Sequence, residues 1–211
     1  MEENKRGIFI SFEGCEGSGK STVAKAICEK LEQDGYDYLF TREPGGTPIA
    51  EAIRSIILNP DTPEMRPQTE ALLYAAARTQ HTLEKIEPAL EVGKLVLCDR
   101  YIDSSMAYQG VARLLGVREI EEINDFGIGG IRPDYVFFFD IAPEESLKRI
   151  AARGKLDRLE QEKLEFHNRV YAYFKSHEEW DKKYVTIDAT KPLEHVIEET
   201  YNNIIKILEA R

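Results

Sequence analysis

The sequence has no long apolar run, few cysteines and no excess of positive charge. None of its apolar stretches approaches the roughly 18 residues of a membrane span, so we expect no contact with a membrane. The charged stretch MEENKRG leads directly into a predicted strand, so we expect no secretory signal. Cys15, Cys28 and Cys98 follow no metal-ligand spacing and form an odd number, which favours a reduced, cytoplasmic protein.

The charge balance narrows the class of ligand. The 211 residues include 38 acidic and 28 basic side chains, giving a formal net charge of −10. This balance argues against a nucleic-acid duplex as partner. A phosphorylated small molecule stays compatible if the positive charges gather at one site.

Apolar runs alternate with amphipathic segments along the whole chain. The runs predict buried strands at 7–14, 36–43, 94–99, 134–140 and 184–189. Helical spacing predicts helices at 21–33, 48–58 (with Thr47 as N-cap), 67–92, 118–126 and 143–153, a helical stretch after Asp99 through Gly110, and a last helix that carries the apolar positions from Val196 to Leu208. No repeat, low-complexity segment or linker interrupts this order. We therefore expect one α/β domain over 1–211, with a parallel sheet covered by helices on both faces.

The stretch GCEGSGKS, from Gly14 to Ser21, matches the phosphate-binding pattern G-x-x-x-x-G-K-[ST] between a predicted strand and a predicted helix. Its glycines let backbone N–H groups face an anion, and the following helix N-terminus adds positive potential. Lys20 is expected to reach the outer phosphates of a nucleoside triphosphate, and Ser21 to bind Mg²⁺. The alternative is a glycine-rich turn that only links two elements. The predicted nucleotide-binding residues are Gly14, Cys15, Glu16, Gly17, Ser18, Gly19, Lys20, Ser21 and Thr22.

Two side chains near this loop have competing interpretations. The apolar run KLVLCD ends in Asp99, which is expected to hold the same Mg²⁺ directly or through water. A cap or turn residue is the alternative for Asp99. A cysteine beside a cationic loop can be reactive, but Cys15 can equally be a small side chain that fits.

A triphosphate site suits a switch, a motor or a kinase. No N-K-x-D motif for reading a guanine base follows a strand, which disfavours a GTPase switch. In the helix predicted at 67–92, a stripe at helical spacing predicts the core face: Leu72, Ala76, Leu83, Ile86 and Leu90. The opposite face carries Glu70, Tyr74, Ala77, Arg78 and His81. This face is either solvated or holds a planar base between Tyr74 and Arg78.

Further candidates lie in two polar stretches. In DRYIDSSMAYQG, one helix face carries Ser105, Tyr108 and Gln109, and an amide can pair with a base edge. In TREPGGTP, Arg42 and Glu43 follow a strand at the sheet edge where ligands bind in open α/β folds, and Glu43–Pro44 is a candidate cis bond.

The stretch KRIAARGKLDRLEQE is basic and short. Arg149 and Arg153 lie one helical turn apart, and Gly154 ends that helix. Asp157 and Glu160 form a capping pair predicted to begin the next helix, with Arg158 in its first turn. We interpret 149–160 as a lid that closes over phosphates; a solvated basic turn is the alternative.

Together, five stretches in this order resemble the thymidylate kinase family over essentially the whole chain: FEGCEGSGKST, TREPGGTPIAEAIR, LLYAAARTQH, LCDRYIDSSMAYQG and RGKLDRLEQE. The first is common to many nucleotide-binding proteins, whereas the second, fourth and fifth in combination are more specific. The resemblance implies a P-loop three-layer sandwich with a five-stranded parallel sheet, and phosphorylation of dTMP to dTDP by ATP and Mg²⁺. It also implies a homodimer.

The resemblance further implies roles for individual residues. Arg78 would hydrogen-bond thymine while Tyr74, where the family more often has phenylalanine, stacks on it. Ser105 and Gln109 would read the base edge, and Tyr108 would crowd the position of a ribose 2′-hydroxyl. Arg54 and Arg100 would grip the dTMP phosphate near Glu43, and Glu16 would meet the sugar 3′-hydroxyl or the metal's water.

Family members differ in the origin of the catalytic arginine. In one group it occupies the loop position held here by Gly17, and in the other it comes from the lid. The resemblance thus assigns Arg153 to the transferring phosphoryl group, with Arg149 and Arg158 as alternatives. A kinase for another deoxynucleoside monophosphate, or a nucleotide-dependent switch, remains open as an alternative function.

Overall fold

A computed structural model of the chain describes residues 6–151, 154, 156–178 and 181–210. Its five strands form one parallel sheet, as the sequence predicts, and the order of the strands in the sheet is β2-β3-β1-β4-β5. The strands are β1 (Phe9–Glu13), β2 (Tyr38–Arg42), β3 (Leu95–Asp99), β4 (Tyr135–Asp140) and β5 (Tyr184–Asp188). Within the described ranges, no helix is both long and apolar enough to cross a bilayer.

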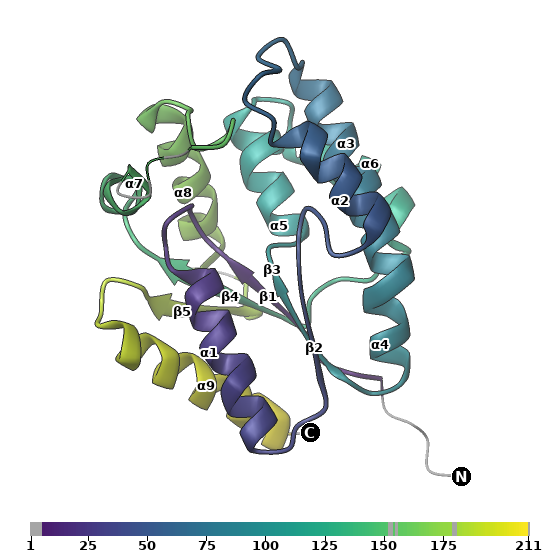
Figure 1. The fold of residues 1–211 in the computed structure, drawn as a ribbon, viewed down its shortest axis with the longest axis vertical. Helices are drawn as coiled ribbons and strands as arrows, with labels where there is room; N and C mark the ends of the chain where they lie inside the picture. Colours follow the sequence, from purple (N-terminus) through teal and green to yellow (C-terminus); the bar gives the residue numbers. More distant parts are fainter. Residues whose placement is uncertain (1–5, 152–153, 155, 179–180, 211) are drawn as a thin grey trace.

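The helical elements alternate with these strands (Figure 1). In chain order they are α1 (Lys20–Gln33), α2 (Pro48–Ile57), α3 (Pro67–His81), the π-helix η1 (Thr82–Ile86), α4 (Glu87–Glu91), α5 (Ile102–Ser105), the π-helix η2 (Met106–Ala112), α6 (Val117–Ile128), α7 (Pro143–Ala151), α8 (Leu164–Glu178) and α9 (Leu193–Glu209).

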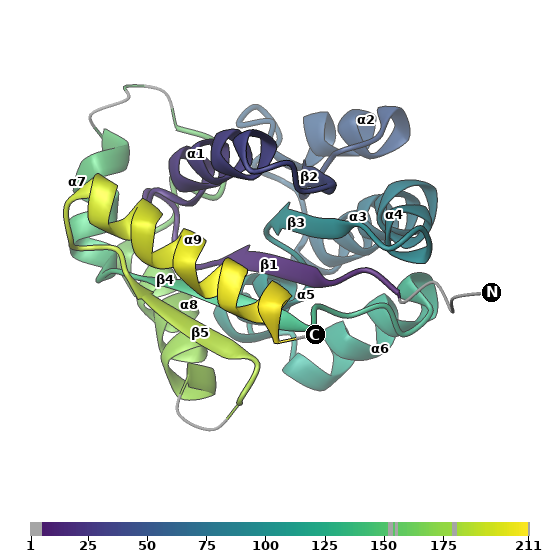
Figure 2. The same ribbon diagram turned by 90° about the horizontal axis from the view of Figure 1, so that it is seen from below.

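Alternate side chains of each buried strand face two separate cores, which gives the molecule its three layers. Ile10, Leu97 and Phe137 pack with α1 and α9 on one face. Phe9 and Val96 pack on the other face with α3, α6, α8 and the segment 101–112. Figure 2 shows α1 and α9 on one side of the sheet and α5, α6 and α8 on the other. Burial on both faces explains why the strand sequences are continuously apolar.

The segment 67–92 is helical throughout, but it is not one regular α-helix. A π-helical turn, η1, separates α3 from α4. Pro88 has no N–H to donate, and its ring crowds the carbonyl one turn earlier, so the hydrogen-bonding pattern widens just before it.

The predicted core face of this segment is wrong over its first two-thirds. Leu72 is 58% exposed and Leu83 is 47% exposed, and only Ile86 and Leu90 of the stripe are buried. The opposite face, from Glu70 to His81, faces the interior instead. Buried charges are tolerated there because each has a charged or hydrogen-bonding partner, so apolar periodicity alone does not identify the core side.

Two other predicted elements also differ from the structure. The segment after Asp99 forms the short α5 followed by η2, rather than one α-helix. Asp157 does cap: its carboxylate accepts from the N–H groups of Leu159 and Glu160, while Glu160 accepts from the N–H of Asp157. This pair closes a single turn, however, and the next helix begins only at Leu164. Arg158 therefore lies in a turn and not in the first turn of a helix.

Candidate active site

The loop between β1 and α1 has the backbone of a phosphate cradle. Gly14, Gly17 and Gly19 have φ values of 134°, 74° and 92°, a region that favours glycine. Lys20 folds back over the loop and donates to the carbonyls of Gly14 and Cys15 at 2.9 and 2.8 Å. Burial, and then the nearby Arg100, lower the pKa of Lys20 to about 8. The ammonium is thus already placed where an anion would favour its charged form.

Gly17 also lies against the helix that precedes the lid. A Cβ atom there would lie 2.4 Å from the Ser146 carbonyl oxygen and 2.8 Å from Ile150 Cγ1 of α7. The loop and α7 therefore touch without room for a side chain at this position. The arginine that some family members carry there would not fit in this chain.

The Ser21 hydroxyl donates to Asp99 at 2.5 Å, so the two predicted metal ligands are adjacent. Asp99 ends β3 next to β1, which is why two residues 78 positions apart in the sequence meet. Both line a cleft of about 340 Å³, a volume usual for ligand pockets. Their oxygen atoms are hard donors of the kind that Mg²⁺ prefers. Thr22 lines the same cleft.

Arg100 connects the loop to the rest of the site. Its guanidinium donates to the Gly14 carbonyl at 2.9 Å, to Ser104 Oγ at 3.0 Å and to Glu16 Oε1 at 2.9 Å. Tyr108 donates to the other Glu16 oxygen at 2.5 Å. Burial alone would raise the pKa of Glu16, but Arg100 and then Lys20 hold it below its usual value. The backbone φ of Arg100 is 72°, a strained value for a non-glycine residue that aims its side chain into the cleft.

Arg54 and Arg42 bring further positive charge to the same cleft. Both donate to the carbonyl of Pro44, Arg54 at 2.8 Å and Arg42 at 3.0 Å. The Glu43–Pro44 bond is cis, which confirms that expectation. Because Lys20 and Arg100 line the cleft as well, the basic residues converge despite the acidic composition.

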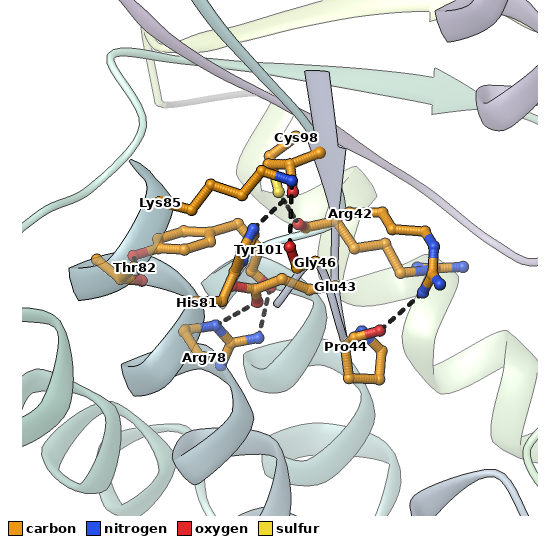
Figure 3. Close-up of polar contacts among 12 residues, drawn as sticks. Arg42, Glu43, Pro44, Gly46, Arg78, His81, Thr82, Lys85, Cys98 and Tyr101 are labelled. Atoms are coloured by element: carbon orange, nitrogen blue, oxygen red, sulfur yellow. Dashed lines mark hydrogen bonds and ion pairs between the residues drawn. The ribbon is translucent and has the colours of Figure 1, made fainter. Parts of the chain in front are cut away.

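Glu43 is the centre of a buried polar chain behind the cleft. Figure 3 shows Arg78 and His81 of α3 directed at its carboxylate. Arg78 Nε donates at 2.7 Å, and His81 Nδ1 lies 3.0 Å from the other oxygen. The second nitrogen of His81 meets the hydroxyl of Thr41 at 2.7 Å. Since the arginine side chain is only 2% exposed and also bonds Ser105 and Asn124, it supports the site from within.

A small recess continues from the cleft and contains the other predicted base-binding residues. Ser105, Tyr108 and Gln109 line it together with Tyr74, as the sequence predicts for one helix face. The recess has a volume of about 30 Å³ and is closed on one side by Leu159. That volume holds about one water molecule, so a base bound between these residues would need side chains around the recess, Leu159 among them, to move apart.

Two of the three candidate arginines of the predicted lid contact residues that do not line the cleft. Arg149 of α7 donates to the Ala189 carbonyl, after β5, at 3.2 Å and does not line the cleft. Arg158 donates to the Ile57 carbonyl at 2.9 Å and pairs with Glu70 at 2.6 Å, so it points away from the loop. Arg153 lies outside the described residues. Asp157, Leu159 and Glu160 of this turn line the same cleft as Lys20.

Several residues of the site gave little or no sequence signal. Asn124 of α6, which bonds Arg78, lies in none of the stretches singled out above, and Ser104, which bonds Arg100, lies in DRYIDSSMAYQG but was not predicted to act there. Asp157 and Glu160 were predicted only as a capping pair within the lid, and Leu159 was not singled out, although all three line the cleft. Cys15 is buried, and burial followed by Glu16 raises the pKa of its thiol to about 12. This favours the small-side-chain interpretation over a reactive thiol.

Glu13, buried directly below the loop, provides a test by pH. It accepts from the Tyr101 N–H at 2.7 Å and from Ser104 Oγ at 2.6 Å, and burial followed by Asp103 raises its pKa to about 8. Since the folded-state value lies above the unfolded one, its stabilising contribution is complete below pH 4.5 and lost as the pH rises through 8.

We therefore expect Glu13→Gln to change the pH dependence of stability. The free energy of unfolding of the unaltered protein should fall by more than that of the variant between pH 5.5 and pH 8.5, in urea titrations. Glu165→Gln, on an exposed face of α8, is the matched control and should follow the unaltered protein. Parallel curves for the protein and Glu13→Gln would contradict the assignment.

Comparison with known proteins finds one family that matches nearly the whole chain. The family model described as thymidylate kinase matches residues 12–200. The chain is 53% identical over 210 residues to the thymidylate kinase of Lactobacillus helveticus, covering 98% of this chain and 97% of that protein. It is 50% identical over 204 residues to the thymidylate kinase of Bacillus licheniformis, covering 95% of each chain. For that of Geobacillus sp. the identity is 49% over 209 residues, covering 98% of this chain and all of the relative.

The geometry and these matches agree. A phosphate cradle, a pair of hard oxygen ligands and a recess lined by aromatic and amide side chains open into one cleft. The extent and level of identity leave the alternative functions without support. The chain belongs to the thymidylate kinase family.

Proposed function

We propose that the protein transfers the γ-phosphoryl group of ATP to dTMP, giving ADP and dTDP, and that Ser21 and Asp99 would hold the Mg²⁺ that this reaction uses. One observation carries this proposal: Arg100 and Glu16 join the phosphate cradle to the recess lined by Tyr74, Ser105 and Gln109. Two phosphate-bearing ligands would thus meet at a single guanidinium.

Positioning and charge do the catalytic work. The transferring group spreads negative charge over its oxygens, so fixed cations and N–H groups aimed at it lower the barrier. Lys20 and the loop N–H groups hold the donor phosphates. Arg54 and Arg100 hold the acceptor phosphate in line, since both line the cleft beside Lys20. Bound Mg²⁺ would neutralise charge on the outer phosphates.

On the acceptor side, Glu16 has one oxygen for Arg100 and one for Tyr108. We propose that this clamp fixes the deoxyribose and that the Tyr108 ring excludes a 2′-hydroxyl. Tyr74 stacks on the base, while Ser105 and Gln109, supported by Arg78, bond its edge. The hydroxyl of Tyr74 distinguishes it from phenylalanine, and burial followed by Glu70 raises its pKa, so it stays neutral.

We propose that 149–160 acts as the lid of a single domain. The recess is too small for a base while Leu159 closes it, so the lid must open for dTMP to enter and close again afterwards. Closure excludes water, which would otherwise accept the phosphoryl group. Arg153 remains the proposed catalytic arginine, with Arg149 and Arg158 as alternatives.

A coupled assay of ADP formation tests the function. With ATP, Mg²⁺ and each of dTMP, dUMP, dCMP, dGMP and AMP, we expect turnover with dTMP to exceed that with every other acceptor. Equal rates with all five would contradict the thymine assignment, and ATP hydrolysis without a phosphorylated product would favour a switch. The same assay tests the lid arginines. Arg153→Ala should lower kcat more than Arg149→Ala or Arg158→Ala, with little change in the KM for ATP. An unchanged kcat would show that Arg153 does not stabilise the transition state.

We also propose a homodimer. α3 packs against α2, η1 and α6, and these four elements carry large exposed apolar side chains: Ile49, Ile56, Leu72, Leu83 and Phe126. Phe126 is 95% exposed, and contact of such a large apolar side chain with water is unfavourable in a monomer. A second copy that covers this patch would bury it. Sedimentation equilibrium should give twice the mass of the chain, and Leu72→Glu should shift it towards the monomer; a monomer at every concentration would contradict the proposal.

The state of the cysteines supports a cytoplasmic location for the protein. Cys15, Cys28 and Cys98 are all unpaired, as expected in a reducing compartment. Cell fractionation followed by detection of the protein would test this; recovery only with secreted or membrane fractions would contradict it.

A further inference from the structure

Glu70 of α3 is a buried carboxylate surrounded by three hydrogen-bond donors and, as an ion-pair contact, a further guanidinium nitrogen, although no motif contains it. It is 1% exposed. Its Oε1 accepts from Gln109 Nε2 at 2.8 Å and from Arg113 Nε at 3.3 Å. Its Oε2 accepts from Arg113 Nη2 at 3.1 Å and pairs with Arg158 Nη2 at 2.6 Å. One carboxylate thus contacts both the base recess and the lid turn.

The contact with Gln109 fixes which end of that amide faces the recess. An ionised carboxylate only accepts, so the NH₂ group of Gln109 must face Glu70 and its carbonyl oxygen must face away. Among the described residues, none hydrogen-bonds that oxygen, and Gln109 lines the recess. The recess therefore has a hydrogen-bond acceptor at this point.

The hydroxyl of Ser105 is fixed as a hydrogen-bond donor, the role complementary to that of the Gln109 oxygen. Arg78 Nη1 donates to Ser105 Oγ at 2.8 Å, which leaves the hydroxyl proton of Ser105 to donate elsewhere. An acceptor beside a donor matches thymine, whose N3–H donates and whose O4 accepts. Cytosine has the reverse pattern, with N3 accepting and its exocyclic amine donating.

The same carboxylate holds the lid turn. Arg158 reaches it directly, and Arg113 reaches it while donating to Glu162 Oε1 at 2.5 Å. Arg113 also lies over the ring of Phe166, 4.8 Å from its centroid. Closing the turn therefore adds a second guanidinium to the carboxylate that orients Gln109.

We propose that Glu70 is a positioning residue for base specificity, orienting the Gln109 amide so that only a base with a donor at N3 is accepted, and linking this orientation to the closed lid. This inference rests on the proposed dTMP kinase function and assigns its selectivity to a side chain outside the predicted site.

The test is the ratio of kcat/KM for dTMP to that for dCMP. In Glu70→Gln, either end of the new amide can face Gln109, so the Gln109 amide can turn and offer its NH₂ group to N3 of cytosine. We expect the ratio to fall by about 10-fold or more, mainly through a higher KM for dTMP. A site whose buried acceptor is fixed discriminates strongly against a base that lacks the matching donor, and this discrimination is lost when the acceptor can turn away.

Two further variants separate orientation from loss of structure or of lid contacts. In the exchanged pair Glu70→Gln with Gln109→Glu, the amide at 70 donates to the carboxylate at 109, whose second oxygen still accepts from N3–H. This double variant should recover the dTMP preference to within about 3-fold. Glu162→Gln, the control, weakens the Arg113 contact without touching Gln109 and should leave the ratio unchanged.

The outcomes distinguish this inference from the proposed function. If the unaltered protein does not phosphorylate dTMP, the proposed function fails. If it does, but Glu70→Gln keeps the unaltered ratio, only the Glu70 assignment is overturned. A double variant whose ratio lies 10-fold or more below that of the unaltered protein, or a loss of that size in Glu162→Gln, would also overturn it. Both comparisons use the unaltered protein, so they hold even if Glu70→Gln does not fold.

Discussion

Replacing Lys20 with methionine should lower kcat about 1,000-fold, roughly 4 kcal/mol of transition-state stabilisation. The ammonium is held by the Gly14 and Cys15 carbonyls above the phosphate cradle, so its charge is already in place before the reaction. Methionine keeps the length and the apolar stem but removes the cation. The KM for ATP should change much less than kcat, because the loop N–H groups still bind the phosphates.

The measurement is steady-state kinetics with ATP and dTMP, with a thermal unfolding curve to confirm folding. Lys25→Met is the matched control, since Lys25 is an exposed residue of the same helix and should leave kcat unchanged. A decrease of less than tenfold in Lys20→Met would place the essential cation elsewhere.

Replacing Arg100 with methionine should lower kcat/KM for dTMP by about 100- to 1,000-fold. Three interactions are lost at once: the contact with the loop carbonyl of Gly14, the bond to Ser104 and the ion pair with Glu16. The carboxylate of Glu16 is then buried without its main partner, which adds a penalty of its own. Because the dTMP phosphate loses the guanidinium that is proposed to bind it, the KM for dTMP should rise more than the KM for ATP.

Arg118→Met on α6 is the control, since Arg118 is exposed and, among the residues that the structure describes, pairs with Glu122 one turn along its own helix. Titration calorimetry with dTMP and with an ATP analogue separates the two sides of the site. An equal loss of affinity for both nucleotides would show that Arg100 supports the loop rather than the acceptor.

The parts of the site that were predicted from sequence are those whose chemistry is local. The phosphate cradle needs its glycines, lysine and serine in consecutive order between a strand and a helix, and these positions coincide with the observed ones. Asp99 could be paired with Ser21 because parallel strands end at one edge of a sheet, and the two residues are hydrogen-bonded.

The parts that were not predicted depend on contacts between distant segments. On α3, Leu72 and Leu83 look like core residues and are exposed, whereas Glu70, Arg78 and His81 look like surface residues and are buried. Each of these buried side chains has its partner on another element, which periodicity within one helix does not reveal. Similarly, the capping pair Asp157 and Glu160 closes only one turn, beside the tertiary contacts that Arg158 makes with Glu70 and Ile57.

The close packing of Gly17 on α7 has a consequence for how such enzymes can diverge. An arginine at Gly17 would strike the carbonyl of Ser146 and the side chain of Ile150, so it could enter only if α7 moved outward. If the catalytic charge comes from the lid, as proposed, moving it to the loop would therefore take more than one substitution in this chain. An arginine at Gly17 would need a second change that allows α7 to shift, such as a smaller side chain at Ile150.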